Sequence, residues 1–213
     1  SKPLASVLRR GPIRLPACLG AVATAIQEIL KYRSARFIER GLLQARVSDK
    51  RLRRRTPVRF KQIRDIAAEL SARIAVDIDI KSSFLEKANF DNRDLILVDK
   101  TALAMQVETD DGKKWFPTLR GILAWQPDGR WAAVDHGAIP FLMNGADCMG
   151  AGVQMADPAV TAGDLVWVRD EEHGKPLALG IAMVDGEEMV AMSKGKAINT
   201  LHWVGDDLWN LDQ

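Results

Sequence analysis

Hydrophobic spacing along the middle of the chain predicts one helix and several short strands. From Lys61 to Ile74, apolar residues recur every three or four positions, as on one face of an amphipathic helix. The alternation of Val76–Ile80 predicts a half-exposed strand, and the runs Leu95–Val98 and Ala102–Glu108 predict two more. We therefore expect a small α/β domain over residues 53–128.

The last third of the chain has a different pattern, with one short helix among compact strands. Ile139, Leu142 and Met143 have helical spacing, and Gly145 stands where a left-handed residue would end that helix. Leu165–Val168 and Leu177–Leu179 are short apolar runs typical of strands. Polar, turn-rich segments separate them, so residues 129–213 are expected to form a second domain rich in strands.

Residues 1–52 form a basic extension ahead of these two domains. A helix is predicted from Pro16, because Leu19, Val22, Ile26 and Ile29 lie on one face. The acid-free residues 1–17 are also compatible with an organelle-targeting segment.

Charge is strongly segregated along the chain. Residues 1–64 contain 17 Lys and Arg against three acidic residues, a balance of +14, whereas residues 65–213 contain 13 against 25, a balance of −12. One end is therefore expected to meet a polyanion, with nucleic acid favoured. The alternative is that this basic segment docks on the acidic remainder of the same chain.

Several function classes lack support in the sequence. Cys18 and Cys148 have no metal-ligand spacing and are expected to be buried, reduced thiols. The three histidines lie far apart, and no phosphate-binding loop or nucleophile motif is found. No apolar run approaches the roughly 18 residues of a membrane span. We expect a cytoplasmic protein that is not an enzyme, with no cofactor, no metal site and no membrane contact.

The C-terminal pattern resembles a PUA domain, a small RNA-binding pseudo-barrel. The resemblance is carried by four segments, which are 135–152, 162–168, 175–183 and 194–203. The fold class implied is α+β, with an N-terminal α/β pre-PUA domain, a C-terminal PUA β pseudo-barrel and the extra N-terminal helical extension.

Further motifs resemble one family, named for multiple copies in T-cell malignancies, together with its archaeal relatives. The resemblance covers about residues 53–211 and rests on Phe116-Pro-Thr-Leu-Arg-Gly-Ile-Leu123, Val134-Asp-His-Gly-Ala-Ile139, Gly145-Ala146, Lys194-Gly-Lys196, Leu201-His-Trp203 and Asp207-Leu-Trp209. The chain departs from the family at Met149-Gly-Ala-Gly152, where members usually have a proline before the last glycine.

The resemblance implies a non-catalytic RNA-binding translation factor. Members engage tRNA and the small ribosomal subunit in initiation, reinitiation or recycling, and some pair with the density-regulated protein, which has a domain resembling initiation factor 1. Ligatin is a single-chain relative. The implied partners are therefore the tRNA acceptor end, small-subunit rRNA, the small subunit itself and a protein with such a domain. The alternative is an RNA-binding module for tRNA or rRNA modification or for ribosome assembly.

Two groups of residues are candidates for RNA contact. In the PUA domain, small residues allow close approach of a nucleic-acid backbone and two lysines can contact phosphate; these are Gly145, Ala146, Gly152, Lys194 and Lys196. In the basic segment, phosphate contacts are expected from Arg51, Arg53, Arg54 and Arg55. The glycines have a purely conformational alternative role, and the lysines can also be solvated turn residues. Trp203 and Trp209 lie among apolar residues and are expected in the core.

Overall fold

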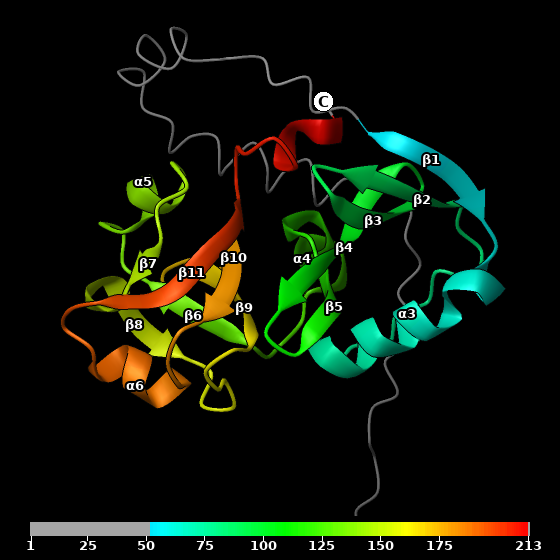
Figure 1. Cartoon of the computed structure of the whole chain (residues 1–213). Coiled ribbons are helices and arrows are strands. Elements are labelled where there is room, and N and C mark those ends of the chain that lie inside the picture. The colour runs from blue at the N-terminus through cyan, green and yellow to red at the C-terminus, as the bar shows by residue number, and fades with distance from the viewer. Residues whose placement is uncertain (1–51, 213) are drawn as a thin grey trace, which may run out of the picture.

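The computed structural model describes residues 52–212, which form two β sheets with helices on their faces (Figure 1). The first sheet is antiparallel in the order β1-β2-β3-β4-β5, with strands Arg53–Val58, Leu85–Phe90, Arg93–Val98, Thr101–Thr109 and Gly112–Pro117. The second sheet has the order β7-β11-β10-β9-β6-β8, with β6 Trp131–Val134, β7 Cys148–Met149, β8 Val153–Ala156, β9 Leu165–Asp170, β10 Pro176–Ala182 and β11 Lys196–Trp203. Only the β6–β9 pair is parallel among these described strands.

Helix α3 (Phe60–Ile74) covers one face of the first sheet and confirms the helix expected from its spacing. Its N-terminal end is fixed by the Arg59 N–H, which donates to Gln62 Oε1 at 2.8 Å. The helix ends at Ala75, which has φ +55 in the left-handed region. Its buried side chains pack on the sheet and are Ile63, Ala67, Leu70 and Ile74.

The expected strand at Val76–Ile80 is wrong. Ile78 and Ile80 are buried as their alternation predicts, but this segment joins neither sheet. Its Ile78 N–H donates instead to the Ser71 hydroxyl at 3.2 Å. Alternation therefore identified the buried positions, whereas strand assignment also requires a neighbouring strand, which the local pattern does not specify.

Two tight turns produce the β2-β3-β4 meander. Asp91 and Asn92 join β2 to β3, and Asp99 and Lys100 join β3 to β4, with φ between +50 and +73 at all four positions. Positive φ at both central residues gives a turn whose twist matches the flanking strands. The strands predicted at Leu95–Val98 and Ala102–Glu108 are confirmed, whereas β1 and β2 had not been predicted.

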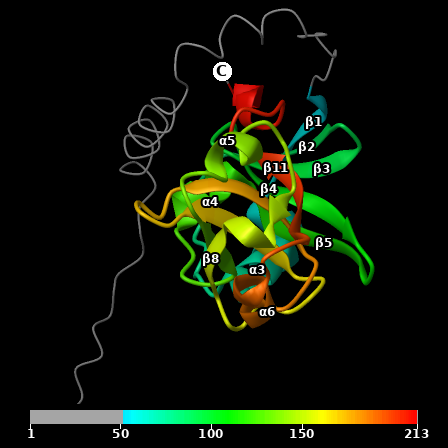
Figure 2. The same ribbon diagram turned by 90° about the vertical axis from the view of Figure 1, so that its left-hand side faces the viewer.

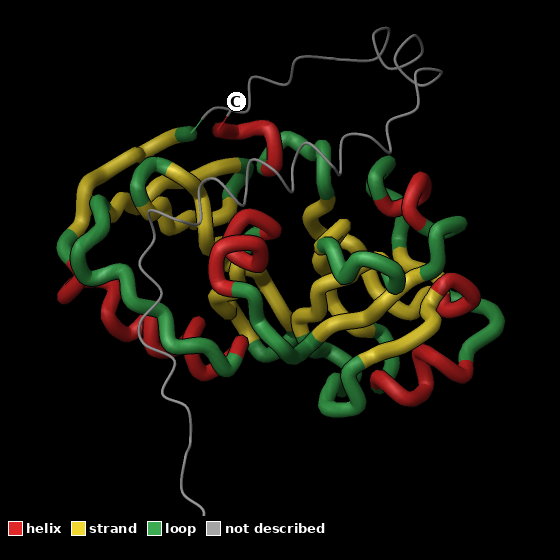
Figure 3. The backbone as a smooth tube through the Cα atoms, turned by 180° about the vertical axis from the view of Figure 1, so that it is seen from behind, coloured by secondary structure: helices red, strands yellow, loops and turns green. Residues whose placement is uncertain are grey.

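Helix α4 (Leu119–Trp125) lies between the two sheets, as the view from behind shows (Figure 3). The Thr118 hydroxyl accepts a hydrogen bond from the Gly121 N–H at 3.1 Å and donates to the Ala102 carbonyl at 2.7 Å, so it both caps α4 and ties it to β4. Gly121 lies so close to the Leu103 carbonyl that a Cβ would collide with it. The Pro-Thr-Leu-Arg-Gly motif therefore has a structural role.

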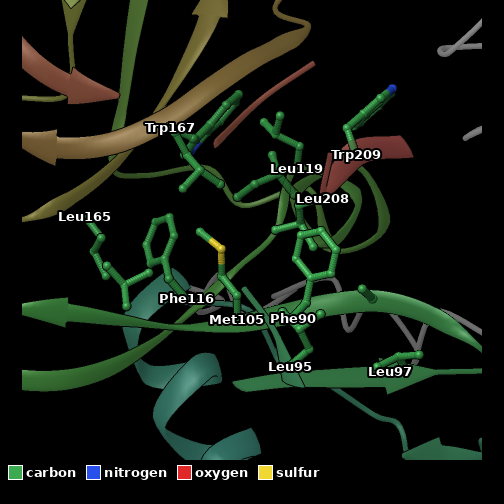
Figure 4. Packing of buried hydrophobic residues seen from close by; sticks show 14 of the residues in the cluster. Phe90, Leu95, Leu97, Met105, Phe116, Leu119, Leu165, Trp167, Leu208 and Trp209 are labelled. Carbon is green, nitrogen blue, oxygen red and sulfur yellow. The ribbon is translucent and has the colours of Figure 1, made fainter. Parts of the chain in front are cut away.

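One hydrophobic core joins the two sheets (Figure 4). Phe90, Leu95, Met105 and Phe116 come from the first sheet, and Leu119 comes from α4; Leu165, Trp167 and Leu179 come from the second sheet, and Leu208 and Trp209 from the C-terminal segment. Because burial of large apolar side chains dominates folding free energy, this shared core couples the two halves. A domain boundary at residue 128/129 stays a prediction.

The C-terminal segment returns to the first sheet as the short helix η3 (Trp209–Asp212), near β1 and β2 in Figure 1. Asp206 organises this return. Its Oδ1 accepts from the Trp209 N–H at 2.7 Å, and its Oδ2 lies 2.6 Å from Nδ1 of the buried His202. The expected core position of Trp209 is confirmed, because this side chain is 2% exposed.

The second sheet encloses its own core and has a short helix at each of two opposite ends (Figure 2). These are α5 (Ile139–Leu142), which confirms the predicted helix, and α6 (Gly186–Ala191). Val134, Val166, Val168 and Ile198 point into this core. On β6 and β9 the alternate residues face outward, toward the first sheet and α4.

Candidate nucleic-acid interface

The predicted PUA site residues gather around the glycine loop, which we define as residues 145–152. This loop leads from α5 through β7 and the short helix η2 (Gly150–Gly152) into β8. Figures 1 and 2 place it near α5, at one end of the second sheet.

Gly145 is required by the local backbone and by the packing beneath it. Its φ of +79 lies in the left-handed region, as predicted, and its N–H donates to the Leu142 carbonyl at 2.9 Å. A Cβ at this position would lie 2.6 Å from Cζ2 of Trp203. The structure thus gives Gly145 a conformational role, and its contact with RNA stays a prediction.

Ala146 and Gly152 occupy the two ends of the loop. Ala146 is exposed, and its carbonyl accepts a hydrogen bond from the Thr200 hydroxyl at 3.0 Å. Gly152 is half-buried, and its carbonyl accepts from the Asp135 N–H at 3.0 Å. Sequence reasoning missed Gly150, where a Cβ would lie 2.5 Å from the Met192 Cβ.

Lys196 forms an ion pair across the β7–β11 pair. Its Nζ lies 2.6 Å from Asp147 Oδ2, and the Asp147 Oδ1 accepts from the Thr200 N–H at 3.0 Å. The hydrogen bond from Lys196 holds the pKa of Asp147 below its usual value, although partial burial opposes this effect. Lys196 is 42% exposed and so keeps access to solvent, and Lys194 is exposed beside it.

Cys148 lies under the loop as a free, buried thiol. Burial raises its pKa to about 12, and the negative charges of Asp135 and Asp147 add to this rise. The expectation of a buried thiol is confirmed for Cys148. Cys18, Arg51 and the helix expected from Pro16 lie outside the described residues.

The arginines of β1 differ in what they contact. Arg55 donates from Nε and Nη2 to the two carboxylate oxygens of the buried Glu86, each at 2.6 Å, in a paired geometry. Arg53 and Arg54 are exposed, and Arg54 has φ +53 at a bulge between β1 and β2. All three arginines are exposed, but Arg55 is engaged by the buried Glu86 and so has a structural role.

Further cations near β1 extend this surface beyond the predicted residues. Arg59 follows β1, Lys61 lies in the first turn of α3, and Lys87 of β2 is close to Thr56 in the strand register. All three are exposed. We call Arg53, Arg54, Arg59, Lys61 and Lys87 the basic edge. The sequence predicted only the arginines within residues 51–55, whereas Lys87 belongs to the basic edge because β2 pairs with β1.

The basic edge and the glycine loop lie at opposite ends of the molecule. In Figure 1, β1 is at the far side of the first sheet, and α5 and β7 are at the far side of the second. The view from behind agrees (Figure 3). The two groups of candidate residues therefore do not form one site, and an RNA that touched both would have to extend across both sheets.

Other kinds of site find little support in residues 52–212. No group of three or more His, Cys, Asp and Glu in this range is placed to hold a metal ion. The helices of the same range include none with the length and apolar character needed to cross a bilayer.

The fold and the glycine loop define a PUA-domain protein, and the family model described as "PUA domain" matches residues 131–204. A relative from Methanocaldococcus jannaschii, described only as an uncharacterized protein, is 42% identical over 161 residues, which cover 75% of this chain and 97% of that one. A solved structure of a hypothetical protein from Pyrococcus horikoshii has a TM-score of 0.62 at 30% identity, covering 75% of this chain and 99% of that one.

A third relative has a name that refers to translation. Translation machinery-associated protein 20 of Saccharomyces cerevisiae is 36% identical over 83 residues, which cover 36% of this chain but only 46% of that protein. The chain belongs to the family of PUA-domain proteins that contains the Methanocaldococcus jannaschii relative and resembles the Malignant T-cell-amplified sequence proteins. The predicted family and the predicted α+β fold with a C-terminal PUA domain are confirmed. The name of the Saccharomyces cerevisiae relative refers to the translation machinery, and neither that name nor the name Malignant T-cell-amplified sequence specifies an enzymatic activity.

Proposed function

We propose that this chain is a non-catalytic, cytoplasmic RNA-binding translation factor that engages tRNA and the small ribosomal subunit. The observation that carries the proposal is the PUA domain, with its glycine loop in place, in a chain whose relatives include translation machinery-associated proteins. Its shared core with a second, cation-bearing sheet supports a single rigid body that presents two RNA-contact surfaces.

Charge suggests different tasks for the two surfaces. Residues 129–212 contain 13 acidic and five basic residues, a net charge of −8, so the PUA half repels a polyphosphate on average. The basic edge attracts phosphates, and its charge supplies most of the sequence-independent affinity. Arg51 belongs to this group by its place in the sequence. We assign rRNA and the body of tRNA to this surface.

The glycine loop is suited to an unpaired RNA end. A single-stranded end brings few phosphates, which limits repulsion by the acidic half, and it exposes base edges that a duplex hides. The exposed Ala146 leaves space for a backbone to approach, with Gly152 at the other end of the loop and Lys194 and Lys196 beside it as phosphate contacts. The tRNA acceptor end is the ligand proposed here.

The direct test compares intact tRNA with tRNA that lacks its three terminal nucleotides. We expect weaker binding of the truncated tRNA and an additional loss of about 1 kcal/mol for Lys196→Ala with the intact form. Lys113→Ala is a matched control, because Lys113 is an exposed lysine on β5 of the other sheet. Equal affinity for both tRNAs would remove the glycine loop from the mechanism.

The second candidate is an RNA-binding module for RNA modification or ribosome assembly. The PUA domain by itself is equally compatible with that function. Sedimentation discriminates the two, since a translation factor comigrates with mature small subunits and an assembly factor with precursor particles. If the chain is a translation factor, we expect a protein partner with a domain like initiation factor 1. It should be captured together with mature subunits.

A further inference from the structure

Arg169 of β9 stacks on an aromatic ring of the neighbouring strand. Its guanidinium carbon lies 3.6 Å from the centroid of the Trp131 ring and 5.7 Å from that of Trp167. Trp131 and Trp167 are partners in the parallel β6–β9 pair, and Arg169 follows Trp167 by two residues, so all three occupy one face. A separation of 3.6 Å places the guanidinium carbon in van der Waals contact with the Trp131 ring.

The guanidinium is held in place, yet its hydrogen-bonding capacity is unused within residues 52–212. Arg55, Arg120 and Arg130 each donate to a protein oxygen, whereas Arg169 donates to none in that range and keeps its nitrogens in contact with solvent. The Trp131 ring is itself fixed, because its Nε1 donates to the Asp128 carbonyl at 2.9 Å. Both groups are half-buried.

Partial burial lowers the pKa of Arg169, although the charge of Asp170 opposes this. The stack on Trp131 offsets the lost hydration of the guanidinium without using its N–H donors. The solvent-facing side of the guanidinium therefore remains available to a ligand.

The position of the stack relates it to the glycine loop. Arg169 pairs with Ala133, and two residues later the Asp135 N–H donates to the Gly152 carbonyl at 3.0 Å. The stack therefore lies on the face of β6 and β9 that points away from the core of the second sheet. Strand β6 ends at Val134, just before the contact with the glycine loop. An RNA strand bound at the glycine loop would have to continue past the end of β6 to meet Arg169.

Nearby charges select the part of the nucleotide that binds. Glu171 and Glu172 are exposed immediately after β9 and repel phosphate. The Asp170 carboxylate faces the turn, where it accepts from the N–H groups of His173 and Lys175 at 2.6 and 3.0 Å. The favourable occupant is therefore a base, whose flat face matches the guanidinium plane.

We infer that the Trp131–Arg169 stack is a nucleobase platform, on which one unpaired base of an RNA strand stacks against the solvent side of the Arg169 guanidinium. The inference rests on the proposed RNA-binding function. Since every base has a flat π face, this platform tolerates any sequence but requires a single strand.

The test uses the full chain, a single-stranded RNA decamer and the same decamer in a duplex. Arg169→Lys keeps the charge and removes the plane, so single-strand affinity should fall roughly tenfold, with an unchanged salt slope. Trp131→Leu should have a similar effect. Lys113→Ala, on β5 of the other sheet, is the control and should leave the single-strand preference intact.

Photocrosslinking with 4-thiouridine in the decamer provides a readout that does not depend on how a variant folds. Crosslinks are expected on the wild-type peptides that contain Trp131 or Arg169. Wild-type affinity in Arg169→Lys, or crosslinks confined to other peptides, would overturn the platform while leaving the proposed function standing. Absence of salt-dependent RNA binding by the wild type would instead overturn both.

Discussion

Arg120 of α4 donates a hydrogen bond from Nη2 to the main-chain carbonyl of Trp209 at 2.8 Å, and its guanidinium carbon lies 4.9 Å from the Trp209 ring centroid. One side chain thus holds both the backbone and the ring of the C-terminal segment. Arg120 is only 8% exposed, so these contacts form where water competes little. The motif that contains Arg120 and the Asp-x-Leu-Trp ending therefore form one structural unit that joins the two sheets.

Replacing Arg120 by Met should weaken this junction. The variant keeps most of the aliphatic stem but loses the charged donor and the cation–π contact, so the free energy of unfolding should fall by about 2–4 kcal/mol. Urea denaturation followed by tryptophan fluorescence measures the loss. Arg64→Met, at an exposed position of α3, is the control and should change stability by less than about 0.5 kcal/mol. Similar effects of the two variants would contradict the role given to Arg120.

A substitution at Gly145 should damage the glycine loop itself. In Gly145→Ala the new Cβ meets the Trp203 ring, and the residue keeps a positive φ that L side chains rarely adopt. We expect a loss of about 2–3 kcal/mol from these two effects. Gly163→Ala, which also has a positive φ but open space around the Cβ position, isolates the strain contribution. Equal losses in the two variants would show that Trp203 does not matter.

The structure shows which features the local sequence can specify. Helix α3, strands β3 and β4 and the left-handed Gly145 were predictable, because spacing and turn chemistry within a few residues determine them. Strand β1 was not, since Arg-Arg-Arg-Thr-Pro-Val has no apolar alternation and lies exposed at a sheet edge. The partners that decide function or stability, Trp203 for Gly145 and Glu86 for Arg55, come from distant parts of the chain.

The Asp147–Lys196 pair should make stability depend on acidic pH. The folded-state pKa of Asp147 is lowered from its ordinary value of 3.8, chiefly by the Lys196 hydrogen bond. The pair therefore contributes stability above pH 3.8 that is lost as pH falls through the lower, folded-state value. Asp147→Asn removes this contribution, so the stability difference between wild type and variant should shrink as pH is lowered below about 4. Thermal unfolding at pH 7, 4 and 3 measures it. A difference that stays constant over this range would show that the ion pair does not stabilise the fold.

The arginines of β1 should separate into two classes when RNA binding is measured against salt. Arg53 and Arg54 face solvent, so replacing both by Ala should reduce the slope of log affinity against log salt by about 1.4–1.8, with little change in stability. Arg55→Met should leave the slope nearly unchanged, because the guanidinium is already neutralised by Glu86. It should instead destabilise the fold by about 3 kcal/mol, since the buried Glu86 then lacks its partner. Salt titrations and denaturation of the wild type, the double variant and Arg55→Met measure both effects. If Arg55→Met changes the slope by as much as the loss of one exposed arginine, Arg55 is an RNA contact.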